Sequence, residues 1–199
     1  MDRRIPSKVE VANYLARQPR WRSRKRAPFV RLPQRRIEHH GREVWDGPGG
    51  YGAWLRARGF AGHATAADVA RAIDLREALR GIALANHDAR GAAEAPALGV
   101  LDTAVARLGA RPGLVPRFAG STSRLEPAAD GPDGALALAL GIVFAARADG
   151  TWSRLKACPH AECGWAFYDH SRNRSGQWCS MRVCGNRTKG SRFRDRHRG

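Results

Sequence analysis

The sequence predicts an α+β protein, with a mainly helical N-terminal and middle part followed by a small treble-clef-like finger of knuckle, β-hairpin and helix. Three observations predict this fold class. Apolar residues recur at helical spacing between residues 65 and 147, all four cysteines lie between residues 158 and 184, and the excess positive charge is confined to the two ends of the chain. With 199 residues, the chain can hold one compact domain and a smaller module.

Residues 1–44 are predicted to form a basic, Arg-rich arm. Between residues 17 and 36 the chain has nine Lys or Arg side chains, no acid and three prolines. Because like charges repel and proline removes a backbone donor, this stretch favours an extended or disordered arm that orders on a partner. A solvated tail without a specific role is the alternative.

Residues 45–150 are predicted to form an α-rich domain. The glycine-rich stretch at residues 46–52 lacks the Lys and Ser/Thr of a phosphate loop and indicates a turn. Thr65 and Asp68 have the spacing of a capping box, and the apolar periodicity after them predicts a helix as far as about residue 89.

The second half of this domain is predicted to contain further helices and two strands. The predicted elements are a helix from residue 98 that Gly109 ends, strands at residues 114–118 and 121–125, and a core helix over residues 135–147 that is buried on most sides.

No catalytic set is visible in residues 45–150. His63, His87 and Asp88 are isolated in the sequence, and no serine has the context of a nucleophile elbow. We therefore expect no enzyme, and we predict that this domain senses a small-molecule effector or forms a homodimer.

The four cysteines are the strongest chemical signal in the sequence. They form two pairs, with four residues inside each pair and fifteen between the pairs. Two such pairs on tight loops can hold one Zn²⁺ per chain, and a site with four thiolate ligands is structural because no coordination position stays open. The predicted ligands are Cys158, Cys163, Cys179 and Cys184. Two disulfides are the alternative to a metal site, but a reducing cytoplasm disfavours them. A second alternative is that His160 replaces one thiolate as a zinc ligand.

The predicted finger covers residues 151–199. Residues 165–168 indicate a strand, and the turn at residues 171–176 leads into its hairpin partner at residues 177–178. Ser180 has the position of a helix cap, so that the last cysteine falls in the first helical turn. Because apolar residues are few here, metal binding is expected to supply much of the folding free energy, on the order of 10 kcal/mol.

The Cys-Gly-Asn-Arg sequence at residues 184–187 and its surroundings resemble a CGNR-type zinc finger, and the helical region before it resembles the ABATE domain of the same family. The residues that carry the resemblance are 169–175, 178–181 and 184–187 in the finger, and 54–57, 75–79 and 150–155 upstream. The resemblance implies a bacterial transcription regulator linked to stress, and also a relation to RNA-binding zinc ribbons.

The basic helix that follows the last cysteine is the predicted nucleic-acid interface. Arginine engages phosphates or pairs bidentately with guanine, and the asparagine amide suits adenine, so this helix could enter a major groove while the hairpin turn adds phosphate contacts. The predicted contact residues are Arg172, Asn173, Arg174, Asn186, Arg187, Lys189, Arg194 and Arg198. Phe193 is expected to anchor the helix to the hairpin. Trp165 and Trp178 are expected to cover the metal-centred core in preference to stacking on bases.

The distribution of charge supports a polyanionic partner. Residues 1–44 carry 13 basic and 4 acidic side chains, residues 45–150 carry 11 of each, and residues 151–199 carry 11 basic and 3 acidic ones. We expect nucleic acid in preference to an anionic lipid surface, and DNA in preference to RNA. A protein-interaction module with a purely structural zinc is the other alternative, and Asn186 and Arg187 could have structural roles, Arg187 by pairing with Asp169.

A cytoplasmic location without a membrane span is also expected. The longest apolar run, residues 135–146, is shorter than the roughly 20 residues of a spanning helix. Residues 1–10 are not followed by the apolar stretch of a secretory signal.

Overall fold

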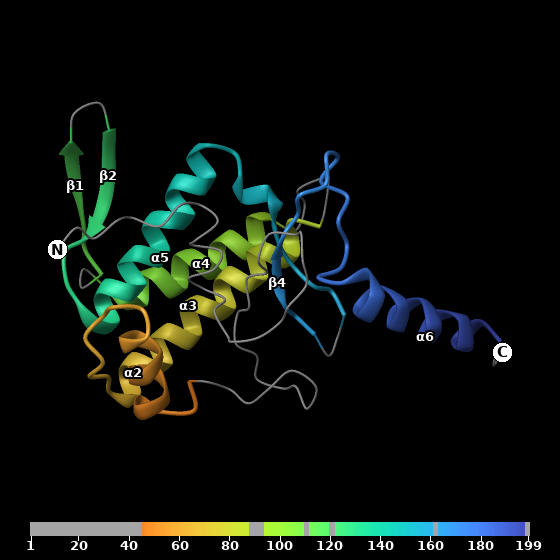
Figure 1. The fold of residues 1–199 in the computed structure, drawn as a ribbon, viewed down its shortest axis with the longest axis horizontal. Coiled ribbons are helices and arrows are strands. Elements are labelled where there is room, and N and C mark those ends of the chain that lie inside the picture. The colour runs from red at the N-terminus through yellow and green to blue at the C-terminus, as the bar shows by residue number, and fades with distance from the viewer. Residues whose placement is uncertain (1–44, 88–93, 110–111, 120–121, 161–162, 198–199) are drawn as a thin grey trace.

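The computed structural model describes residues 45–87, 94–109, 112–119, 122–160 and 163–197 (Figure 1). The predicted arm at residues 1–44 lies outside them. The elements follow one another as α2 (Pro48–Arg56), α3 (Ala66–Ala85), α4 (Glu94–Leu108), β1 (Leu114–Ala119), β2 (Thr122–Pro127), α5 (Gly131–Ala148), η1 (Trp152–Arg154), β3 (Leu155–Ala157), β4 (Ala166–Tyr168), η2 (Met181–Gly185) and α6 (Asn186–Arg196). This order of helices, a hairpin and a small finger with its own sheet confirms the predicted α+β class.

The glycine-rich start of the domain is helical from Pro48 on, so the prediction of a turn at residues 46–52 is wrong for residues 48–52. Pro48 occupies the first position of α2, where proline fits because its missing N–H needs no partner. Tyr51 is 1% exposed and packs edge-on against Trp45. A Cβ at Gly52 would lie 2.2 Å from the carbonyl oxygen of Gly62, so glycine is required for this close approach. Tertiary packing therefore overrides the local preference of these glycines.

Helix α3 begins at the predicted capping box. The backbone N–H of Asp68 donates to Thr65 Oγ1 at 3.2 Å, and the backbone N–H of Thr65 donates to Asp68 Oδ2 at 2.8 Å. The helix ends at Ala85, before the predicted end near residue 89. Its buried residues Leu75 and Ile82 lie at the centre of the core.

The core is formed where α2, α3, α4 and α5 meet. Leu101 and Leu108 bring α4 to α3, and Gly109 ends α4 with a φ of 66°, which glycine adopts without strain. The predicted strands form an antiparallel hairpin, β1 with β2, which packs on α5. These contacts confirm the predicted second helix and hairpin.

Helix α5 begins at Gly131, four residues before the predicted helix, because the Asp130 side chain accepts the N–H of Gly131 at 2.7 Å. Leu136 and Val143 are buried, whereas Phe144 is 66% exposed, so the helix is not buried on most sides along its whole length. By length and composition, α5 could cross a membrane, but 44% of it is buried inside the protein. Its packing against α3 and β2 is that of a core helix and by itself does not indicate a membrane span.

The sheet of the finger pairs β3 with β4, antiparallel, with Leu155 opposite Tyr168 and Ala157 opposite Ala166. The predicted pairing of residues 165–168 with residues 177–178 is therefore wrong. The strand that precedes the first cysteine takes that place, which puts the first knuckle at the tip of the hairpin. Helix α6 projects from the rest of the molecule at the other side of the finger (Figure 1).

Candidate metal centre

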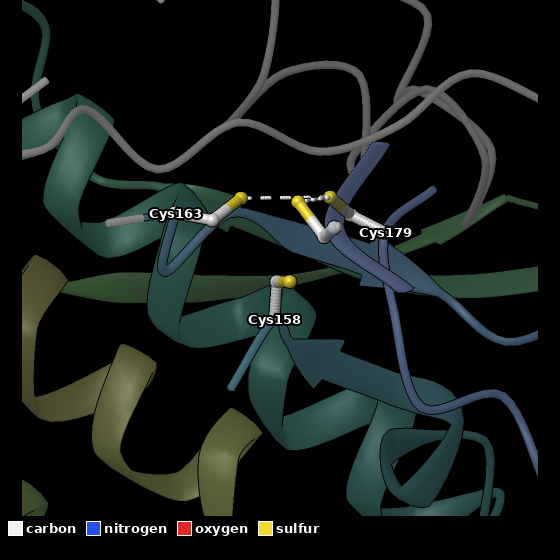
Figure 2. A group of neighbouring side chains, drawn as sticks. Cys158, Cys163 and Cys179 are labelled. Carbon is white, nitrogen blue, oxygen red and sulfur yellow. Dashed lines mark hydrogen bonds between the residues drawn. The ribbon is translucent and has the colours of Figure 1, made fainter. Parts of the chain in front are cut away.

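Four thiols converge at the junction of the hairpin and the last helix. Cys158, Cys163, Cys179 and Cys184 come from separate segments, and their sulfur atoms all lie within 4.8 Å of one another (Figure 2). Within the described residues, this is the only group of His, Cys, Asp and Glu side chains placed to hold a metal, and His160 is not part of it.

The spacing of the sulfurs fits a tetrahedral zinc site. Cys163 Sγ lies 3.5 Å from Cys179 Sγ, which lies 3.6 Å from Cys184 Sγ. A tetrahedron with Zn–S bonds of about 2.3 Å has edges of about 3.8 Å between sulfurs. All four cysteines are free, since these separations far exceed the roughly 2.05 Å of a disulfide bond. The donor set is thus that of one structural zinc ion.

The thiols influence one another strongly. Hydrogen bonds from Cys163 and Cys179 lower the pKa of the Cys158 thiol, and hydrogen bonds with Cys158 raise the pKa values of Cys163 and Cys179. Four thiolates in this space need a cation among them, so zinc binding must displace protons from the cluster.

Backbone hydrogen bonds shape the first knuckle. The N–H of Cys158 donates to the carbonyl of Trp165 at 2.7 Å, and the N–H of Cys163 donates to the carbonyl of His160 at 2.8 Å. Gly164 follows with a φ of 54°, a conformation that glycine adopts readily. These bonds hold the first two sulfurs at the tip of the β3–β4 hairpin.

The second knuckle passes directly into the terminal helices. Ser180 Oγ accepts the N–H of Val183 at 3.3 Å, which confirms the predicted cap, and Cys184 lies in the helical turn that this cap begins. A Cβ at Gly185 would come within 2.4 Å of Met181 Sδ and 3.1 Å of Trp178 Cδ1. Close packing beside the metal site therefore explains this glycine.

A buried carboxylate organises the loop between β4 and the second knuckle. Asp169 accepts the N–H groups of Ser171 and Gly176 at 2.9 and 2.8 Å and forms an ion pair with Lys156. Burial alone would raise the pKa of Asp169, but Lys156 and the two N–H donors hold it well below its usual range. Asp169 thus has Lys156 as its ion-pair partner, and not Arg187, which was the alternative to a nucleic-acid contact for that arginine.

The predicted nucleic-acid residues occupy two segments of the finger. Arg172, Asn173 and Arg174 are exposed on the 169–176 loop, Asn186, Arg187 and Lys189 are exposed on α6, Arg194 lies within α6, and Arg198 lies outside the described residues. Arg174 adopts a φ of 52°, which is unusual for a residue other than glycine, and its guanidinium donates to Ser153 Oγ at 2.8 Å. Arg174 thus also has a structural contact within the finger.

The aromatic residues of the finger divide into two groups. Trp165 and Trp178 pack against the buried cluster around the cysteines, as predicted. Phe193 is 56% exposed and stacks on His197, with ring centroids 4.0 Å apart, so the prediction that it anchors the helix to the hairpin is wrong. An exposed aromatic pair, Phe193 in α6 and His197 just after it, therefore lies at the C-terminal end of this helix.

Sequence reasoning missed two polar contributions to the finger. Lys156 is 2% exposed, although an isolated lysine in a basic segment is typically on the surface. His87, which the sequence treats as isolated, is half-buried and hydrogen-bonds through Nε2 to the carbonyl of Ala157 at 2.7 Å. Burial lowers the pKa of His87 and favours its neutral form. No local signal identifies these residues, because their partners are distant in the sequence.

Two family models match the chain. The model described as "CGNR zinc finger" matches residues 154–197, and the ABATE model, described as "Putative stress-induced transcription regulator", matches residues 29–151. Their order is the one that the motifs predict. A search of curated proteins finds no match.

Proposed function

The chain belongs to the ABATE family and carries a C-terminal CGNR zinc finger, and on this premise we propose that it is a zinc-dependent, DNA-binding transcription regulator. The observation that carries the proposal is the continuity between the metal site and a basic helix. Cys184 lies in the turn that leads directly into α6, whose residues Arg187 and Lys189 are exposed. A metal-anchored, projecting cationic helix is suited to the major groove of a duplex.

The 169–176 loop supplies a second cationic contact in this proposal. Lys156 and Asp169 hold the loop from inside the finger, and Arg172 and Asn173 are exposed upon it. Contacts from such a loop to phosphates would orient the helix on the duplex without reading its sequence.

Binding of the zinc-loaded full chain to a DNA duplex, measured by fluorescence anisotropy over a range of salt concentrations, tests the proposal. The association constant is expected to fall by about 0.9 log unit per log unit of salt for each phosphate contacted. Arg187→Ala should weaken binding, whereas Arg117→Ala should not. Arg117 is the matched control, because its side chain is 61% exposed on the β1–β2 hairpin and its substitution removes the same charge. Absent or salt-independent binding would reject the proposal.

RNA binding is a second candidate, favoured by the exposed stack of Phe193 and His197. An exposed aromatic ring on a helix of basic sequence is the kind of surface on which an unpaired base stacks. Competition between duplex DNA and single-stranded RNA distinguishes the two candidates. If RNA is the ligand, RNA competes better and Phe193→Ala removes that advantage.

The upstream domain and the cellular location of the protein also belong to the proposal. We propose that residues 45–150 sense a small-molecule effector or form a homodimer, and that the protein acts in the cytoplasm without enzymatic activity. Sedimentation of the zinc-loaded chain measures its oligomeric state.

A protein-interaction module with a purely structural zinc is the alternative to nucleic-acid binding. If Arg187→Ala and Arg194→Ala both leave nucleic-acid affinity unchanged, this alternative replaces the proposal.

A further inference from the structure

The end of α3, taken as residues 80–87 and so including the two residues that follow the helix, is hydrogen-bonded to the finger by three side chains. Arg80 Nη1 donates to the carbonyl of Gly164 at 2.7 Å, and His87 Nε2 lies 2.7 Å from the carbonyl oxygen of Ala157. Asn86 Nδ2 donates to the carbonyls of Trp152 and Leu155, at 3.0 and 2.7 Å. All four acceptors are backbone carbonyls. These hydrogen bonds therefore fix the path of the finger's backbone and not the position of its side chains.

Two of these carbonyls flank the first knuckle. Ala157 immediately precedes Cys158, and Gly164 immediately follows Cys163. Arg80 and His87 therefore hold the two ends of the segment that presents two of the four thiols. Helix α3 thus spans the base of the knuckle from outside the finger.

The side chain of Arg80 is held in place by a neighbouring residue of α3. Glu77 Oε2 and Oε1 accept hydrogen bonds from Arg80 Nε and Nη2 at 2.8 and 3.1 Å, which orients the guanidinium toward Gly164. Burial alone would raise the pKa of Glu77, but Arg80 and Arg76 lower it below its ordinary value. Between the polar contacts, Ala83 and Ala157 are both 0% exposed. Arg80 is therefore oriented before it meets the finger.

We propose that this end of α3 controls how firmly the finger retains its metal, with Arg80 and His87 as positioning residues for Cys158 and Cys163. Ordering the ligands of a metal site reduces the free energy of metal binding, unless the protein already holds the ligands in place. Because α3 fixes both ends of the knuckle, part of that ordering is complete before the metal binds. By linkage, the metal must in turn stabilise the end of α3.

This coupling gives the upstream domain a route to the finger. A ligand or partner that displaces the end of α3 would weaken metal retention, and it would also disturb α6, which begins at the same cysteine cluster. The inference depends on the metal site and not on nucleic-acid binding.

Transfer of zinc from the full chain to a chromogenic chelator, in the absence of nucleic acid, tests the inference. Arg80→Met keeps the aliphatic stem but removes the donors, and His87→Phe keeps a ring that cannot donate. Each is expected to release zinc on the order of 10- to 100-fold faster than wild type, as for other groups that orient metal ligands. Arg107→Met, which removes a charge from a side chain that is 69% exposed on α4, should release zinc at the wild-type rate.

A measurement without substitutions keeps the inference falsifiable if either variant fails to fold. Hydrogen exchange at residues 80–87 of the wild-type chain should be faster after zinc removal than in the loaded protein. Unchanged exchange in these residues, zinc release from both α3 variants at the wild-type rate, or equal acceleration in the Arg107 control would each overturn the inference. Because the assays contain no DNA or RNA, their outcome is independent of the proposed function.

Discussion

Lys156 Nζ and Asp169 Oδ2 form an ion pair of 2.8 Å inside the finger, where their side chains are only 2% and 3% exposed. The Lys156 ammonium also donates to the carbonyl of Gly176 at 3.1 Å, and Arg154 donates to the carbonyl of Ser171 at 2.9 Å. These contacts close the loop between β4 and the second knuckle against β3. One buried charge pair therefore determines where the basic loop stands relative to the metal site.

We predict that Asp169→Ala strongly destabilises the protein. The substitution leaves the Lys156 ammonium buried without a counter-charge, which typically costs about 3–5 kcal/mol. Asp74→Ala is the control, because Asp74 is 53% exposed and lies 3.9 Å from its partner Arg107. Urea unfolding of the zinc-loaded proteins gives both free energies. Equal values for the two variants would show that the buried pair contributes no more than a surface contact.

Two glycines in helices should respond in opposite directions to alanine. Gly52→Ala places a Cβ 2.2 Å from a backbone oxygen, and the displacement needed should cost about 1–3 kcal/mol. Gly81 lies inside α3 with no atom within 4 Å of such a Cβ, so Gly81→Ala should stabilise the protein by about 0.5–1 kcal/mol. Melting temperatures measure both effects, and a lower melting temperature for Gly81→Ala would contradict the packing described for α3.

The capping box of α3 predicts a pH-dependent contribution to stability. Burial alone would raise the pKa of Asp68, but hydrogen bonds from Thr65 and the interaction with Arg71 lower it below its ordinary value. The group therefore contributes stability that is present above the ordinary aspartate pKa and is lost as the pH falls through the lowered pKa. Asp68→Asn should cost about 1 kcal/mol at pH 7 and less as the pH falls below about 4.

The exposed Asp102 on α4 provides the control for this prediction. The difference in unfolding free energy between wild type and Asp68→Asn is the quantity to follow, because acid also weakens the zinc site of both proteins equally. If the difference stays constant between pH 7 and pH 3, or if Asp102→Asn reproduces it, the capping box does not contribute pH-dependent stability.

Removal of zinc should unfold the finger while most of the upstream domain stays folded. The helical core and the cluster around the cysteines are separate groups of buried residues, and among the described residues Phe167 is the one buried non-cysteine member of the cysteine cluster. Chelation should therefore expose Trp165 and Trp178 but leave Trp45 and Trp54 buried. Tryptophan fluorescence and far-UV circular dichroism of the chelated chain measure the two responses, and loss of all helix on chelation would contradict the independence of the helical core.

The parts of the fold that the sequence predicts correctly have local causes. The capping box at Thr65 and Asp68 needs only two residues three positions apart, and Ser180 acts on the helical turn that follows it. The cysteine spacing also predicts the cluster, because the requirements of a tetrahedral zinc site limit how the two pairs can meet.

The parts that sequence reasoning missed depend on distant partners. Gly52 in α2 is required by its close approach to the backbone of Gly62, and the pairing of β4 with β3 is determined by the chain on the other side of the knuckle. Arg80 and His87 have the polar character of a solvent-facing helix surface, yet both are directed at the finger. A single sequence carries no signal for such contacts, since Arg and His also occur on surfaces that contact nothing.

Elemental analysis combined with a DNA titration on the same natively purified protein tests whether a zinc ion holds the finger in its DNA-binding form. We expect one zinc ion per chain, together with salt-dependent binding that chelation abolishes and added zinc restores. A chain that contains no zinc when purified under reducing conditions, or that binds DNA equally well after chelation, would contradict this expectation.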